Sequence, residues 1–266
     1  MIRIDPMPNQ TRRIKRMIED LKQPFLSHLT ELRSRLIYCA IAIGIGFILS
    51  YAFKEKLFKL LVSPLIANMA DDSKLVFTNL PEMFFTYLKT AFVAGLIIAS
   101  PVIFYQIWMF VAPGLYQREK KYIIPFVLCS TILFAGGALF GYKVVFPFGF
   151  KFFLGYENSY IQALPKVKEY FSFSTKLLLA FGIVFELPIV IFFLARIGAV
   201  TPELLRKKRK YAVLLTFAAA AIFTPPDVVT QCMMAVPLII LYEVGIIIAQ
   251  IFGKKRDVEE GEKQDK

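Results

Sequence analysis

Histidine is almost absent from this chain of 266 residues, in which His28 is the single one. A metal centre built on several histidines is therefore excluded, and no Ser–His–Asp set can be assembled around a histidine that lies among charged residues. The three cysteines, Cys39, Cys129 and Cys232, lie far apart in apolar stretches, so the sequence indicates neither a disulfide framework nor a CxxC metal site. A P-loop and a dinucleotide-binding fingerprint are also missing. We expect no cofactor, no metal and no enzymatic activity, and favour binding or transport.

Charged residues are scarce as well, at 20%, whereas hydrophobic residues make up 57% and the mean hydropathy is +0.58. Soluble domains average about 25% charged residues. The hydrophobic residues fall into long blocks, which is typical of membrane proteins. The net charge is +12, and the basic residues flank the apolar blocks. We interpret them as contacts with lipid headgroups and determinants of topology, and expect no nucleic-acid partner.

Six apolar blocks predict an all-α integral membrane protein with six transmembrane helices. They cover residues 36–53, 81–110, 122–146, 173–197, 211–223 and 230–252. The fifth has about 13 residues, or roughly 20 Å, which is too short to span a bilayer alone. We expect Pro24 to interrupt the chain before the first helix. Residues 148–171 are predicted to form a polar loop, and residues 54–80 a mixed loop whose first half is an interfacial helix stopped near Pro64.

Lysine and arginine are distributed unevenly between the segments that connect these helices. The N-terminal segment, the second-to-third and fourth-to-fifth connections and the tail hold 22 of the 32, and the three alternate loops hold seven. This bias predicts that both termini are cytoplasmic. We divide the chain into a basic extension (residues 1–23), a membrane domain (residues 24–253) and a charged tail (residues 254–266).

Two acidic residues, Glu31 and Glu119, fall at the predicted cytoplasmic surface. From spacing alone, Glu31 is best interpreted as an i,i+4 pair with Arg35, worth a few tenths of a kcal/mol. Glu119 is similarly best interpreted as a solvated charge in a basic loop. Considered together they are more informative, because a carboxylate can bind an arginine in bidentate fashion, and two carboxylates can bind two arginines.

Glu186 is predicted to lie deep in the membrane, where an acidic residue is costly. Two interpretations carry equal weight: a functional group, or a protonated carboxyl hydrogen-bonded inside the bundle. The first makes a proton-coupled small-solute secondary transporter the alternative function, although no repeat relates the two halves of the chain. An intramembrane enzyme lacks a nucleophile and base.

Four sequence blocks resemble the TatC family, and together they are highly specific. They are residues 28–36 (HLTELRSRL), residues 100–108 (SPVIFYQIW) leading into 110–116 (FVAPGLY), residues 180–188 (AFGIVFELP) and residues 224–231 (TPPDVVTQ). They occur in the family's order, and the resemblance covers roughly residues 24–253.

The resemblance implies a receptor and core subunit of the twin-arginine protein translocase in the bacterial cytoplasmic (inner) membrane. Such proteins recognise signal peptides with consecutive arginines and help to export folded proteins with the single-helix partners TatA and TatB, driven by the proton-motive force. Self-association and contact with membrane lipid are also implied. The implied fold is a concave bundle with a periplasmic cap and two short final helices.

The resemblance also implies roles for individual residues. Glu31 and Glu119 are expected to bind the arginine pair. The residues expected around them are Leu32, Arg33, Phe110, Pro113 and Tyr116. Pro64 is expected in the periplasmic cap and Glu186 in the concave membrane face, while Asp227 and Gln231 are expected at the turn between the last two helices, where partners bind.

Overall fold

The computed structural model describes residues 8–69, 74–111, 123–158, 160–224 and 227–253, with side chains from residue 29 onward. Within these residues the chain is helical, and extended pairing is limited to two isolated bridges. Five helical segments in this part of the chain are long and apolar enough to cross a membrane. They are Leu29–Ala52, Glu82–Val111, Ile123–Leu154, Val167–Arg196 and Val228–Phe252. The all-α membrane fold is therefore confirmed, and the protein is multi-pass.

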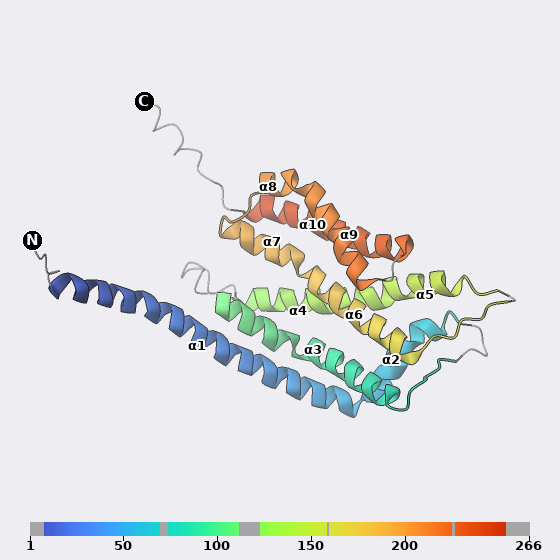
Figure 1. Ribbon diagram of the computed structural model, residues 1–266. Coiled ribbons are helices and arrows are strands. Elements are labelled where there is room, and N and C mark those ends of the chain that lie inside the picture. The colour runs from blue at the N-terminus through green and yellow to red at the C-terminus, as the bar shows by residue number, and fades with distance from the viewer. Residues whose placement is uncertain (1–7, 70–73, 112–122, 159, 225–226, 254–266) are drawn as a thin grey trace, which may run out of the picture.

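The first helix, α1 (Pro8–Ala52), packs along α3 (Glu82–Val111), as Figure 1 shows. The expected interruption at Pro24 is wrong, because α1 continues through this position. A proline inside a helix lacks the N–H that bonds to the preceding turn, and α1, at 45 residues, continues without this bond. The two helices approach closely at Gly46 and Gly95, where a Cβ on Gly46 would lie only 2.4 Å from the Gly95 carbonyl oxygen.

The third apolar block extends further than predicted. α4 (Ile123–Phe140) passes through a π-helical turn, η3 (Gly141–Val145), into α5 (Phe146–Leu154). Residues 148–154 were expected in a loop, but α5 has a buried face that includes Phe146 and Phe150. The Phe150 ring packs 5.1 Å from the ring of Tyr170, so burial of aromatic surface favours the helix over a loop.

The fourth block is broken in two at Glu186, between α6 (Val167–Phe185) and α7 (Leu187–Arg196). A short helix that the sequence did not predict, α8 (Pro202–Lys207), follows; the Thr201 hydroxyl caps it by accepting a bond from the Leu204 N–H at 3.2 Å. The last two helices are α9 (Arg209–Phe223) and α10 (Val228–Phe252). The prediction of two short final helices is correct for α9, at 15 residues, and wrong for α10, at 25.

One end of the bundle is tied together by a carboxylate. Glu82, at the start of α3, is 5% exposed. Its Oε2 accepts bonds from the backbone N–H groups of Thr78 and Asn79, and its Oε1 accepts one from the Lys168 N–H at 2.7 Å. Lys168 lies in the first turn of α6, where helix N–H groups have no intrahelical partner. Glu82 therefore joins the loop before α3 to the start of α6.

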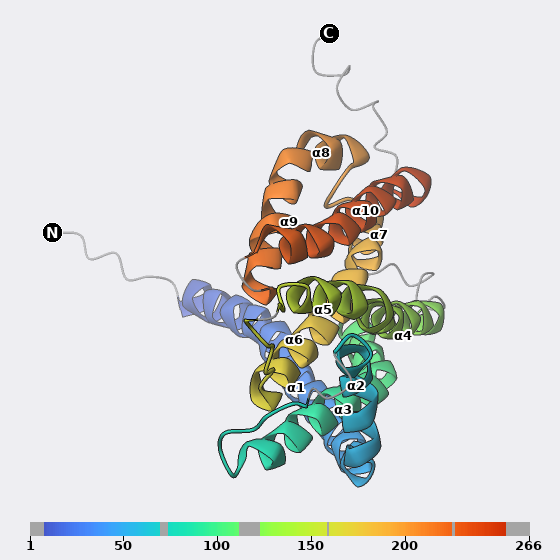
Figure 2. The ribbon, with the colours of Figure 1, turned by 90° about the vertical axis from the view of Figure 1, so that its right-hand side faces the viewer.

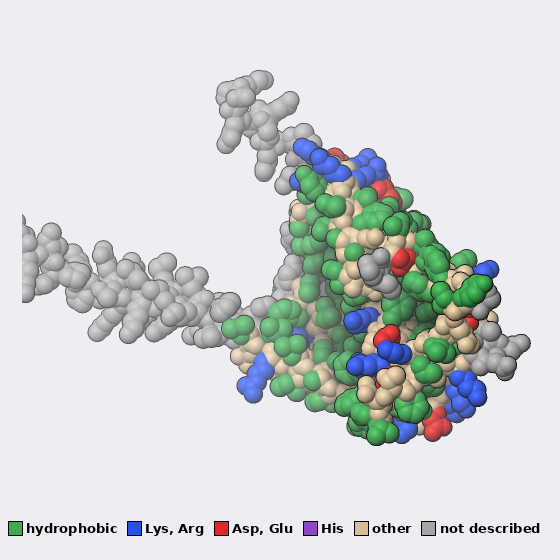
Figure 3. Space-filling view, turned by 45° about the vertical axis from the view of Figure 1, so that its right-hand side comes forward, with side chains coloured by type: hydrophobic (Ala, Val, Ile, Leu, Met, Phe, Trp, Pro, Cys, Tyr) green, Lys and Arg blue, Asp and Glu red, His purple; other side chains and the backbone are tan. Residues whose placement is uncertain are grey.

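The helix ends gather at two opposite ends of the molecule. The end of α3, the start of α4 and the ends of α7 and α10 share one end, beyond which the first part of α1 projects, and α2 (Lys54–Ile66), the end of α5 and the start of α6 share the other (Figures 1 and 2). Figure 3 shows hydrophobic side chains over much of the visible face, and many large ones are exposed. Such a surface fits a lipid environment.

Candidate functional site

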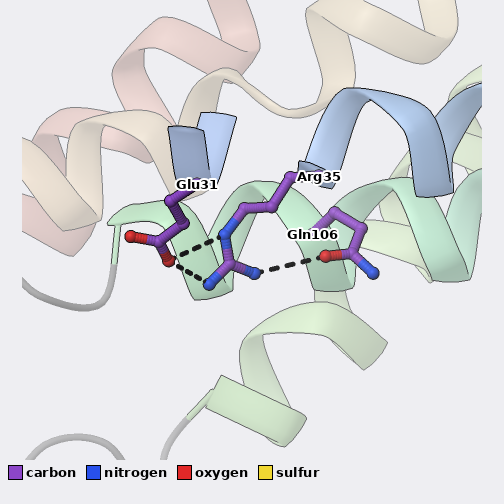
Figure 4. Close-up of polar contacts among 3 residues, drawn as sticks. All are labelled: Glu31, Arg35 and Gln106. Carbon is purple, nitrogen blue, oxygen red and sulfur yellow. Dashed lines mark hydrogen bonds and ion pairs between the residues drawn. The ribbon is translucent and has the colours of Figure 1, made fainter. Parts of the chain in front are cut away.

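The polar centre nearest to the predicted arginine site links α1 to α3. The Arg35 guanidinium donates from Nε to Glu31 Oε1 at 3.0 Å, and its Nη2 bonds to the same oxygen (Figure 4). Its Nη1 donates to Gln106 Oε1 on α3 at 3.2 Å. The i,i+4 pair is therefore present, but it is not confined to an exposed helix face: the Arg35 side chain is 17% exposed, against 36% for Glu31.

A shallow, mostly apolar hollow lies on another face of α1, turned away from Glu31 and Arg35. Leu32, predicted for the site, is half-buried, and Arg33, also predicted, is exposed. The hollow is lined by Leu29, Leu32, Arg33, Leu36, Ile37 and Ala40. Apolar side chains with one cation at the edge can accept an extended or helical apolar segment with a polar end.

The far side of the site is formed by the end of α3. Phe110, the last but one residue of α3, is half-buried. Trp108 is 8% exposed, stacks on Phe126 with ring centroids 5.1 Å apart, and donates from Nε1 to the Ser130 hydroxyl on α4 at 3.2 Å. These contacts fix the end of α3 against α4. The predicted site residues Pro113, Tyr116 and Glu119 lie outside the described residues, in the connection between these two helices.

Glu186 occupies the break between α6 and α7. Its backbone ends α6, with its N–H donating to the Ile183 carbonyl at 3.1 Å, and begins α7, with its carbonyl accepting from Val190 at 2.9 Å. Its side chain is partly buried, and Ser130 is a neighbouring polar group. Among the side chains that the structure describes, none hydrogen-bonds to Oε1. The hydrogen-bonded carboxyl expected under one interpretation is therefore not satisfied at this oxygen.

Asp227 and Gln231 both have partners within the fold. Asp227 is the N-cap of α10: its Oδ1 accepts from the Thr230 N–H at 2.7 Å, and its Oδ2 accepts from the Thr230 hydroxyl. Gln231 donates from Nε2 to the Phe217 carbonyl on α9 at 3.0 Å. These bonds fix the angle at which α10 leaves α9.

Pro64 lies inside α2 and does not stop it. A proline has no N–H, so the carbonyl four residues earlier, that of Leu60, lacks its usual helical donor. The Tyr142 hydroxyl donates to this carbonyl at 2.8 Å, and the Tyr170 hydroxyl donates to the next one, that of Leu61, at 2.5 Å. Pro64 therefore belongs to the contact that holds α2 on the rest of the bundle.

Comparison of the sequence and the fold with known proteins shows to which family this chain belongs. The sequence model described as Sec-independent protein translocase protein (TatC) matches residues 27–237. The chain belongs to the TatC family. It is 56% identical over 244 residues to the Sec-independent protein translocase protein TatC of Desulforapulum autotrophicum, covering 92% of this chain and 90% of that protein. It is 38% identical to the protein of the same name from Escherichia coli K12, covering 91% and 94%.

Solved structures agree with this family assignment. A crystal structure of the twin arginine translocase receptor TatC superposes with a TM-score of 0.76 at 42% identity, covering 84% of this chain and 98% of that one. A second, in DDM, gives a TM-score of 0.78 at 42% identity, covering 86% and 100%. The chain is thus a receptor subunit of a protein translocase, and not an enzyme. Protein translocation replaces the small-solute transporter that Glu186 had made the alternative.

Sequence reasoning did not find two polar contacts of this TatC-family chain. Gln106 was quoted only as part of the block at residues 100–108 that resembles the family, although a glutamine within an apolar run is itself a signal for a buried partner. Glu82 was not singled out, because one of its three donors, Lys168, lies 86 residues away in sequence. Both contacts depend on which helices become neighbours.

Proposed function

We propose that Glu31 and Glu119 bind the paired arginines of a twin-arginine signal peptide. The position of Glu31 carries this proposal. Glu31 is bonded to Arg35, and Arg35 is bonded to Gln106 on α3, which lies five residues before α3 ends at Val111. The segment that contains Glu119 follows directly. In addition, one oxygen of Glu31 already accepts two nitrogens of a guanidinium, so this carboxylate is presented in a geometry that arginine can use.

The remaining predicted residues would surround the peptide. The hollow on α1, with Leu32 and Arg33 in its lining, is suited to the hydrophobic stretch that follows the arginines. Phe110 at the end of α3 would continue this surface. We assign Pro113 and Tyr116, in the connection after α3, to the same site.

We propose that the chain lies in the bacterial cytoplasmic membrane with both termini in the cytoplasm. The asymmetry of lysine and arginine supports this orientation. It requires an even number of crossings, so α9 would be the sixth. α7 ends at the end of the bundle where α1 begins, and α10 starts at the other end, so α9 carries the chain between them (Figure 1). At 15 residues, or about 22 Å, α9 would thin the bilayer locally.

The partners that we propose are the single-helix proteins TatA and TatB, membrane lipid and further copies of this chain, with export driven by the proton-motive force. Pro64, Glu186, Asp227 and Gln231 are the candidate positions for partner contacts. Asp227 and Gln231 also bond within the fold, so a substitution at either would change both the fold and the contact.

Crosslinking of the full-length chain to a signal peptide tests the arginine site. A peptide with consecutive arginines and one with consecutive lysines are each captured in membranes that contain the wild type, Glu31→Gln, Glu119→Gln or the double variant. We expect preferential capture of the arginine peptide, which the double variant loses. Glu203→Gln is the matched control, because it removes an exposed carboxylate from α8, at the same end of the bundle.

Two results would contradict the proposal. Equal capture of both peptides by the wild type would remove the specificity for arginine. Unchanged export of a folded reporter by the double variant would show that the two glutamates are not the site.

A further inference from the structure

Two lysines lie within the apolar length of membrane helices, and not beside it. Lys89 lies seven residues after the start of α3 at Glu82, and Lys176 lies nine residues after the start of α6 at Val167. A lysine inside a transmembrane segment is costly unless its ammonium meets a partner or reaches the membrane surface. We propose that these two lysines form a binding site for the headgroup of an anionic phospholipid. This inference goes beyond the proposed export function and uses the proposed orientation only to name the outer leaflet.

The two ammonium groups are brought to one face of α6 by Ser172. The Lys89 Nζ donates to the Ser172 hydroxyl at 3.2 Å, and this bond crosses from α3 to α6. Ser172 and Lys176 are four residues apart, so they are neighbours on one face of α6. The Lys89 ammonium therefore lies about one helical turn from the backbone of Lys176. Two cations from two helices are thus presented side by side.

This face of α6 carries an excess of positive charge. Lys176 is exposed, and among the residues that the structure describes neither lysine forms an ion pair with a carboxylate. Glu169 lies on the same face, but its carboxylate is paired with Lys166 at 3.6 Å. Each ammonium has three donors, and Lys89 uses one of them on Ser172. The phosphate of a lipid supplies both the negative charge and the acceptor oxygens that this pair lacks.

The turn between α9 and α10 indicates the depth at which the membrane surface meets α6. A narrow cavity is lined in part by Phe173 and Leu177 of α6 and by Thr224, which follows α9. The Thr224 backbone is extended, and Val228, the first residue of α10, is 74% exposed. Non-helical backbone that faces lipid does not occur in the hydrocarbon core. The hydrocarbon of the outer leaflet therefore ends near the level of Phe173 and Leu177, the level at which Lys176 lies.

This level favours a lipid as the ligand. Ser172 and Lys176 lie about 8 Å and about 14 Å from the start of α6, whereas a headgroup layer is about 5–7 Å thick. A surface lowered to the turn before α10 brings phosphate groups to both lysines. On the same face, Leu179 and Ile183 continue toward the middle of the membrane, where acyl chains lie. The face therefore matches a molecule with an anionic head and apolar chains.

The test measures lipid binding at this face of the full-length chain. A bimane label is attached to Ile183→Cys, a position that is 64% exposed and about 10 Å from Lys176, in a chain whose three cysteines are replaced by alanine. The protein is placed in phosphatidylcholine vesicles that contain increasing fractions of phosphatidylglycerol or phosphatidylcholine with brominated acyl chains. Quenching of the label gives the relative association constants of the two lipids. We expect phosphatidylglycerol to be preferred, and added salt to lower the preference.

Four variants assign the preference to the lysines. Lys176→Gln should lower it by about fivefold, the effect of one basic residue near an anionic headgroup. Lys89→Gln should lower it by a similar factor, and the glutamine amide can still donate to Ser172. Lys176→Arg keeps the charge and should retain the preference. Lys59→Gln is the matched control: it removes an exposed lysine from α2, at the same end of the bundle, and should leave the preference unchanged.

Three results would overturn the inference. Equal binding of the two lipids by the unsubstituted lysines would show that no anionic headgroup is selected. An equal loss in Lys59→Gln and Lys176→Gln would reduce the effect to the general attraction of a basic protein for anionic lipid. If Lys176→Gln kept the lipid preference but lowered energy transfer between labelled copies of the chain in one vesicle, the ligand of the lysines would be an acidic group of a neighbouring helix.

Discussion

The crossing of α1 and α3 at two glycines determines whether the polar contact between Arg35 and Gln106, in the proposed signal-peptide site, can form. Arg35 lies eleven residues before Gly46 on α1, and Gln106 lies eleven residues after Gly95 on α3. Eleven residues are about three helical turns, or roughly 16 Å. Each polar residue therefore lies on the face of its helix that carries the glycine, and the distance between the two helices at the crossing is transmitted to the site.

We predict that Gly46→Ala separates the two helices. The new Cβ would lie 2.4 Å from the Gly95 carbonyl oxygen, which is 1.0 Å less than the 3.4 Å at which ordinary contact begins. The obstructing atoms belong to the backbone, so no side chain can move aside. Overpacking costs about 1–3 kcal/mol, and replacing a helical glycine returns about 0.5–1 kcal/mol. We expect a net loss of about 1–2 kcal/mol in the free energy of unfolding.

The same shift should break the site. The bond from Arg35 to Gln106 is 3.2 Å long, and a separation of a few tenths of an ångström takes it beyond the hydrogen-bond limit. Trp108, the single tryptophan, is buried on α3, so its fluorescence during titration with SDS in mixed micelles reports unfolding. Gly44→Ala is the matched control, since its Cβ would meet nothing within 4 Å. Equal stability of the Gly44 and Gly46 variants would refute this reasoning.

Further predictions concern the other contacts of the bundle. Gly137→Ala should destabilise the packing of α4 on α6 by about 1–2 kcal/mol in the same titration, because its Cβ would lie 2.4 Å from a backbone oxygen, whereas Gly136→Ala should not destabilise it, because its Cβ would meet nothing within 4 Å; equal effects would contradict this. Glu82→Gln should speed deuterium exchange at the Lys168 amide, because one amide group cannot accept all three backbone bonds; unchanged exchange would show that the carboxylate is not needed. Asp227→Ala should cost about 1 kcal/mol through loss of the α10 cap, and Asp227→Asn much less; two equal losses would point away from capping.

The sequence predicts the membrane helices well because their signal is local. A long apolar run predicts a helix whatever its neighbours are, and the predicted blocks at 81–110 and 230–252 differ from α3 and α10 by only a few residues. The brevity of α9 was also evident from the block at residues 211–223, which has only about 13 residues. By contrast, α5 was missed, because the proline and the charged residues around it resemble a loop, and only packing against α6 favours the helix.

The site was predictable in part. The charge and spacing of Glu31 and Arg35 predicted their pairing, which the structure confirms. Spacing could not predict that Gln106, 71 residues away, would accept from the same guanidinium, since this requires the register of α1 on α3. The sequence analysis also did not predict that Glu186 would lie at a helix break. Pro188, in the first turn of α7, cannot donate a hydrogen bond to the preceding turn, but Pro101 lies inside the unbroken α3, so a proline alone does not predict a break.

Two prolines inside helices each leave one backbone carbonyl without its helical donor, and the replacement donor differs between them. Pro101 leaves the Ile97 carbonyl without a helical donor, and the neighbouring Ser100 hydroxyl bonds to it at 2.7 Å, so the loss is made good within α3. Pro64 leaves the Leu60 carbonyl in the same condition, but there the donor is Tyr142, from another part of the bundle. In α3 the carbonyl that lacks its helical donor is therefore bonded by a side chain of the same helix, whereas in α2 it is bonded by a side chain from another element. Because the shared bond goes to a backbone oxygen, substitutions of the exposed side chains of α2 leave this attachment to the bundle in place.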